Sequence, residues 1–215
     1  SGVTQNYITR LLSNGTRDTG FTIGTGFDNY VKVIKQQSDG KILVGGFFNS
    51  YSGVTQNYIT RLLSNGTRDS SFNIGTGFNN SVCNINIVNN KILVNGAFNS
   101  YGGTTADKSL LLNSNGSVYK IYNDILTQSP NNEVATSYVD GNTFIIGQRF
   151  TLTNNTFLDF DYLNNKVLNY NPLYKLMEVD NNGMVDSYNY DGFDNYAFCF
   201  TKQSDNKILV GGMFT

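Results

Sequence analysis

An internal repeat constrains the fold of this chain more than any other feature of its sequence. Residues 1–18 read SGVTQNYITRLLSNGTRD, and the same text returns 51 residues later at 52–69. A second text, Lys-Ile-Leu-Val followed by Gly-Gly or Asn-Gly, occurs at 41–46, 91–96 and 207–212, and a divergent copy lies within 140–150. A fixed period of about 50 residues is typical of chains that stack copies of one structural unit. The sequence therefore predicts repeated units rather than conventional domains.

Each unit is predicted to contain four short strands. In the unit that is easiest to follow, alternation and apolar runs predict strands at 30–36, 41–48, 58–63 and 68–74. The Asn65-Gly66 pair between the third and fourth strands is typical of a tight β-hairpin. Four antiparallel strands in a unit of about 50 residues, repeated in tandem, indicate a propeller blade. The prediction is an all-β protein, a β-propeller of about four four-stranded antiparallel blades.

The predicted blades divide the chain into one propeller domain over 1–215. Three blades cover 24–74, 75–125 and 126–190, and a fourth is shared between 1–23 and 191–215. The chain begins with the third and fourth strands of a unit and stops after the first and second, so joining the two ends would close a ring. A cut from a longer array leaves the same ends, and both alternatives stay open; a segment of a longer chain is expected.

The blade predicted at 126–190 is longer than the others. The turn glycines lie at positions 15, 66, 116 and 183, so their steps are 51, 50 and 67 residues. This difference places an insertion within 151–172, where an exposed loop is expected. The insertion contains a candidate binding loop of aromatic and acidic side chains, Phe157, Asp159, Phe160, Asp161 and Tyr162. Such residues suit sugar binding, although packing of the loop onto its own blade is the favoured interpretation.

Composition excludes several classes of function. The chain has 15 Lys plus Arg against 16 Asp plus Glu, and no stretch collects one sign, so a nucleic-acid partner is not expected. No apolar run approaches the length of about 18 residues that would suggest membrane insertion. The chain has no His, which removes the usual general base and the commonest metal ligand. We expect no catalytic site, no metal and no cofactor.

The two cysteines and the repeat-periodic charged residues favour structural roles. Cys83 and Cys199 lie in apolar runs and are predicted to be buried thiols, with a disulfide or a reactive thiol as the alternative. Arg10 and Arg61 are interpreted as exposed outer-strand residues rather than an anion clamp. The remaining periodic groups are interpreted as turn or strand hydrogen-bonding residues rather than metal or glycosylation sites: Asp18, Asp69, Asp186, the turn 180–183, and the acceptor-pattern residues Asn14, Asn65, Asn115 and Asn154.

The repeat resembles a known family. Gln37 to Gly46, Arg61-Leu62, Asn65-Gly66 and Asp69 to Phe72 are similar to the delta-sixty β-propeller repeat. The third unit departs from the pattern, with 143–148 in place of the apolar core text and no Arg-Leu pair. The resemblance implies a propeller fold in secreted bacterial surface proteins or bacteriophage structural proteins, without one shared activity.

The favoured hypothesis for function is a non-enzymatic component of a bacteriophage virion. It would lie in a tail, fibre or capsid appendage, contact other virion proteins, and either recognise a host-surface glycan or act as a rigid spacer. The alternative is an adhesion domain of a secreted or cell-surface bacterial protein. A propeller enzyme acting on polysaccharide, with Glu178 or Asp161 as the acid, is the least favoured hypothesis.

Overall fold

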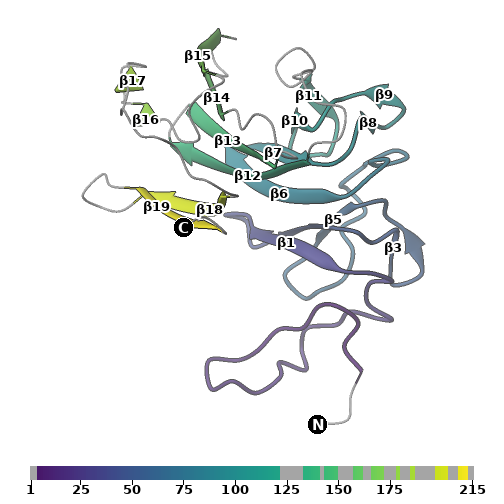
Figure 1. The fold of residues 1–215 in the computed structure, drawn as a ribbon. Coiled ribbons are helices and arrows are strands. Elements are labelled where there is room, and N and C mark those ends of the chain that lie inside the picture. Colours follow the sequence, from purple (N-terminus) through teal and green to yellow (C-terminus); the bar gives the residue numbers. More distant parts are fainter. Residues whose placement is uncertain are drawn as a thin grey trace. The chain divides into compact units, whose positions relative to one another are not determined.

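The computed structural model describes residues 4–121 with their side chains and, beyond them, the backbone of eight strands within 133–212. The chain divides into two compact units, Ser1–Asn123 and Asp124–Thr215, and each is described by itself. The described residues form antiparallel β-sheets and no helix (Figure 1). No segment with the helical length and apolar character of a membrane span occurs among them.

The first unit contains two successive sheets whose strands follow one another in chain order. A three-stranded sheet consists of β1 (Val31–Gln36), β2 (Ile42–Gly46) and β5 (Ile59–Leu62). A four-stranded sheet consists of β6 (Val82–Val88), β7 (Lys91–Gly96), β10 (Ser109–Leu112) and β11 (Val118–Ile121). Short hairpins join the second and third long strands of each sheet: β3 (Ser50–Tyr51) with β4 (Val54–Thr55), and β8 (Ser100–Tyr101) with β9 (Thr104–Thr105). Their meander order is the order predicted for propeller blades.

The fourth strand expected at 68–74 is wrong, because only a single bridge between Leu62 and Arg68 forms there. The carboxylate of Asp69 accepts hydrogen bonds from the backbone N–H (3.0 Å) and hydroxyl (2.6 Å) of Ser71, and Phe72 N–H donates to the Asp69 carbonyl (3.2 Å). These bonds turn the chain out of the ladder. In the next repeat Tyr119 occupies the position of Asp69, and there the predicted fourth strand is confirmed as β11.

A β-bulge recurs at the same position in the first strand of four repeats, namely in β1, β6, β12 and β18. The register shifts between Val31 and Val33, Val82 and Asn84, Val134 and Thr136, and Ala197 and Cys199. The bulge carries the backbone across the glycine on the next strand. A Cβ built at Gly46 would lie 2.2 Å from the Tyr30 carbonyl oxygen, and one at Gly96 would lie 2.1 Å from that of Ser81. These glycines therefore stand where two backbones approach closely.

The second unit contains a four-stranded sheet and two separate hairpins. The sheet consists of β12 (Glu133–Asp140), β13 (Thr143–Arg149), β14 (Phe157–Asp161) and β15 (Lys166–Asn171). The hairpins pair β16 (Glu178–Val179) with β17 (Val185–Asp186) and β18 (Ala197–Lys202) with β19 (Ile208–Gly212). Lys202 opposes Ile208 as Gln36 opposes Ile42, so β18 and β19 repeat β1 and β2. That 1–23 completes this blade stays a prediction.

Two segments of the insertion within 151–172 form strands. β14 and β15 both lie inside it and continue the sheet, since Ile145 opposes Asp159 and Asp159 opposes Asn169. The expectation of an exposed loop is therefore wrong for 157–161 and 166–171. Both segments are rich in the aromatic and β-branched residues that favour strands. The short strands β16 and β17 follow them in the chain.

Two apolar clusters fill the first unit. One joins buried residues from the N-terminal segment and the first sheet: Ile8, Phe21, Ile23, Phe27, Val44, Phe48, Tyr51 and Leu62. The other joins the first and second sheets through residues that include Leu43, Ile59, Phe72, Phe78, Val82, Val94 and Phe98. The ring centroids of Phe27 and Phe48 lie 4.3 Å apart, and those of Phe78 and Phe98 lie 4.2 Å apart. Each repeat thus packs its connecting segment against the sheet of the next, as stacked repeats require.

Candidate functional site

The periodic Arg61 joins two successive repeats from a buried position. Its Nε donates to Asp69 Oδ2 at 2.8 Å, and the two side chains are 5% and 7% exposed. Another guanidinium N–H donates to the carbonyl of Ser114, in the hairpin turn of the following repeat. The guanidinium carbon also lies 4.8 Å from the centroid of the Phe72 ring. The interpretation of Arg61 as an exposed surface residue is therefore wrong, because the strand reversal at Asp69 folds over it.

The same arrangement occurs one repeat earlier in a more open setting. Arg10 Nε donates to Asp18 Oδ2 at 2.8 Å, and a second guanidinium N–H donates to the Ser64 carbonyl. The Arg10 side chain is 39% exposed. The predicted structural role of Asp18 and Asp69 is confirmed at both positions. Both guanidinium groups donate to acceptors within the protein, which favours a structural role over an anion-binding clamp. The sets Arg10, Asp18, Ser64 and Arg61, Asp69, Ser114 are called the arginine clasps below. The side chain of Asp186 lies outside the described residues.

Asp69 gives the clasp a dependence on pH. Burial acts to raise the pKa of its carboxyl, but hydrogen bonds from Ser71 and Arg61 outweigh burial and lower the pKa to about 2. Because the folded-state pKa is lowered, its contribution to stability is complete above the unfolded pKa and is lost as pH falls through the folded value. We expect the free energy of unfolding to fall more steeply between about pH 5 and pH 2 in the wild type than in Asp69→Asn. Urea unfolding followed by circular dichroism across this range checks the difference, and equal slopes would contradict it.

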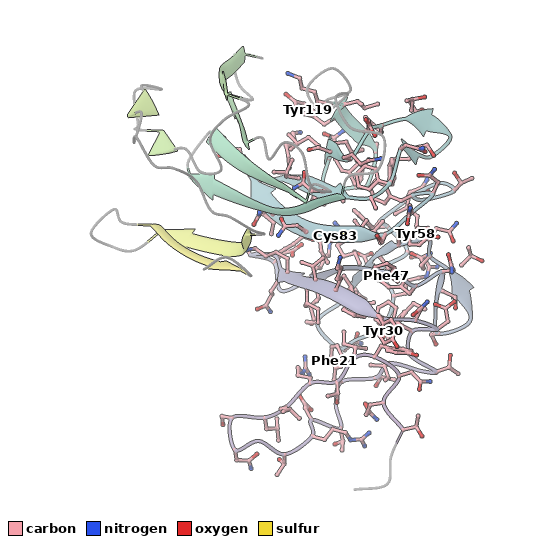
Figure 2. All side chains as sticks on the ribbon, in the orientation of Figure 1. Phe21, Tyr30, Phe47, Tyr58, Cys83 and Tyr119 are labelled. Atoms are coloured by element: carbon pink, nitrogen blue, oxygen red, sulfur yellow. The ribbon has the colours of Figure 1, made fainter. Side chains whose placement is uncertain are left out.

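An exposed group of three aromatic rings lies where the N-terminal segment meets the first sheet. Tyr7, Tyr30 and Phe47 are 47%, 66% and 38% exposed, and together they are called the aromatic surface below. The Tyr7 and Tyr30 rings meet edge to face with centroids 5.4 Å apart. Phe47 N–H donates to the Tyr30 carbonyl at 2.8 Å, so the backbones of Tyr30 and Phe47 are neighbours, and Figure 2 labels both residues in the region of β1. Clustered exposed aromatics of this kind are typical of interaction sites.

The repeat shows that the fold does not need these rings. Ser81 and Ala97 occupy the positions of Tyr30 and Phe47 in the next repeat, and Ala97 N–H donates to the Ser81 carbonyl at 3.0 Å just as Phe47 does to Tyr30. Lys108 occupies the position of Tyr7 two repeats on and adopts the same left-handed backbone, with φ of 62° against 64°. The backbone thus keeps its conformation with a serine at the position of Tyr30, an alanine at that of Phe47 and a lysine at that of Tyr7. The aromatic surface is an addition to the blade rather than part of its architecture.

The sequence-predicted binding loop is a strand in the structure. Phe157, Asp159, Phe160 and Asp161 all lie in β14, between β13 and β15, and Tyr162 lies outside the described residues. A binding role for them stays a prediction. No group of three or more metal-ligating side chains occurs within the residues that carry described side chains. Cys83, predicted to be a buried thiol, is confirmed as buried in β6, and the side chain of Cys199 is not among those described.

Comparison with known proteins supports the propeller fold. Residues 1–21, 37–72 and 89–118 match a family described as a β-propeller domain of unknown function (DUF5122). The matched segments contain the Asn-Gly hairpin turns, both arginine clasps and the second strand of each of the first two blades. No curated protein matches the chain. The chain is an all-β protein with a β-propeller fold, built from antiparallel repeats of about 50 residues.

Proposed function

We propose that this chain is a non-enzymatic β-propeller module of a bacteriophage virion, placed in a tail, fibre or capsid appendage, which binds a host-surface glycan. The observation that carries the binding role is the aromatic surface of Tyr7, Tyr30 and Phe47. A sugar ring has an apolar C–H face that packs on an aromatic ring, and its hydroxyls remain free to bond with polar neighbours. The fold does not require these rings, because the next repeat folds without the counterparts of Tyr30 and Phe47.

The virion assignment rests on the architecture and on the resemblance of the repeat. Arginine clasps join successive repeats within 4–121, and repeats tied in this way suit an appendage that must hold its shape outside a cell. The delta-sixty repeat that the sequence resembles implies bacteriophage structural proteins as one of its two settings. The absence of histidine from the whole sequence supports a non-enzymatic role. The partners on this proposal are other virion proteins and the host glycan.

The binding role is tested with the purified chain and a panel of bacterial surface polysaccharides. The variants Tyr30→Ser and Phe47→Ala copy the residues of the following repeat, so they are expected to fold. We expect the double variant to bind the recognised polysaccharide at least about tenfold more weakly, because two stacking faces are lost. Tyr119→Ser, which removes an exposed ring outside the aromatic surface, is the matched control and should bind as the wild type does.

Two results would contradict this proposal. Equal binding by the wild type and by the double variant would show that the aromatic surface does not bind the polysaccharide. Shortening of the polysaccharide during incubation with the purified chain would show an enzyme in place of a binding module. Chain length is followed by size-exclusion chromatography of the polysaccharide alone.

A further inference from the structure

The bulges of successive blades bring a lysine and a cysteine together. Lys32 is the extra residue of the bulge in β1, and Cys83 is the extra residue at the same position of β6. A bulge turns its extra side chain away from the regular alternation of the strand. The Lys32 Nζ donates to Cys83 Sγ at 3.2 Å, across the boundary between the two blades.

The surroundings hold both groups in place. Cys83 is 7% exposed, and the Ser81 hydroxyl lies 3.8 Å from its sulfur. The Lys32 Nζ also lies 5.2 Å from the centroid of the Phe47 ring, so a cation–π contact directs the ammonium toward this spot. Figure 2 labels Cys83 and Phe47 in neighbouring positions. Once the sulfur is oxidised, an amine held at contact distance attacks it far faster than a free amine in solution would.

We propose that hydrogen peroxide causes Lys32 and Cys83 to form a covalent cross-link between the sheet that contains β1 and the sheet that contains β6. The Cys83 sulfur attacks one oxygen of hydrogen peroxide, the O–O bond breaks, and the products are a sulfenic acid and water. The deprotonated Lys32 nitrogen then attacks the sulfur, the S–O bond breaks, and the hydroxyl leaves as water with a proton from the nitrogen. One thiol, one amine and one peroxide thus give one S–N bond and two waters. Sulfur loses two electrons and peroxide gains them.

The product is a covalent link between β1 and β6. Sulfenic acids are known to condense with nitrogen in this manner, and a thiol reductant cleaves the S–N bond and restores both side chains. The link would fasten the two blades together under oxidising conditions, beside the aromatic surface. It does not depend on the proposed glycan binding, since it needs only the Lys32–Cys83 contact and peroxide.

Mass spectrometry of the full chain in a Cys199→Ser background tests the cross-link. This background leaves a single cysteine, so a loss of two hydrogens cannot come from a disulfide within the chain. After brief treatment with hydrogen peroxide we expect the intact mass to fall by about 2 Da, and to recover with dithiothreitol. Tryptic digestion should yield one peptide pair joined through Lys32 and Cys83.

Matched variants make the result decisive. Lys32→Arg keeps a positive charge beside the sulfur but has no nucleophilic amine, so peroxide should add oxygen to Cys83 without any loss of two hydrogens. Denatured chain, in which the two residues are apart, should behave in the same way. A Cys199→Ser chain whose mass only gains oxygen, or a loss of two hydrogens that persists when Lys32→Arg is added to that background, would overturn the proposal.

Discussion

Replacing Arg61 with alanine is expected to lower the free energy of unfolding by about 3 kcal/mol or more. The change removes the closer of two cationic partners of a buried carboxylate, since Asp69 is 7% exposed and accepts from Arg61 Nε at 2.8 Å, whereas Lys41 Nζ lies 3.6 Å away. It also leaves the Ser114 carbonyl of the next turn without the guanidinium donor. Urea unfolding followed by far-UV circular dichroism measures the loss, since the chain has no Trp to serve as a fluorescent probe.

Arg10→Ala is the matched control for that measurement. Arg10 makes the same contacts with Asp18 and Ser64, but its side chain is 39% exposed and water can replace the lost partners. We expect a much smaller loss than for Arg61→Ala. Equal losses in the two variants would show that burial does not set the strength of the clasp. If Arg61→Ala does not fold, Arg61→Lys should still be destabilised, because a lysine cannot bond Asp69 and Ser114 together.

Gly46→Ala is the second variant with a large expected effect. Its new Cβ would lie 2.2 Å from the carbonyl oxygen of Tyr30 and 3.0 Å from the Cα of Val31. Both atoms belong to backbone that the bulge holds in place, so neither can move aside as a flexible side chain would. We expect a loss of about 3 kcal/mol in the free energy of unfolding, at the upper end of overpacking costs. The same urea titration measures it.

Gly53→Ala separates this steric effect from the general cost of replacing a glycine. Gly53 lies in the turn between β3 and β4 with φ of 76°, and a Cβ there would meet nothing within 4 Å. Only the left-handed backbone resists the change, at about 1 kcal/mol. A loss for Gly53→Ala as large as that for Gly46→Ala would mean that the close approach of β1 and β2 does not constrain position 46.

The sequence predicts the strands of the fold well, and its failures have local causes. The repeated Lys-Ile-Leu-Val text locates β2, β7 and β19 because an apolar run flanked by turn residues has few alternatives. The fourth strand fails at Asp69 because one carboxylate can bond the chain that follows it, which no periodicity reveals. The spacing of the repeats predicts a loop at the insertion because it shows only that residues are added. It does not show that 157–161 and 166–171 pair as strands.

The arginine clasp and the aromatic surface escaped prediction for different reasons. The partner of Arg61 in the next repeat, Ser114, lies 53 residues away, and its carbonyl has no signature in the sequence. The aromatic surface did leave a signal, because Tyr30 and Phe47 replace the serine and alanine of the following repeat. A comparison of repeats position by position finds both residues. Only the structure shows that both are exposed and that the Tyr30 ring contacts Tyr7.

Competition with phage adsorption tests the proposed function most directly. Host cells are incubated with the purified chain before the phage that carries it is added, and the fraction of unadsorbed particles is counted. We expect the wild-type chain to block adsorption and Tyr119→Ser to block it equally. The Tyr30→Ser, Phe47→Ala double variant is expected not to block it. Adsorption that is unaffected by saturating wild-type chain, or blocked equally by the double variant, would contradict a virion module that binds its host through the aromatic surface.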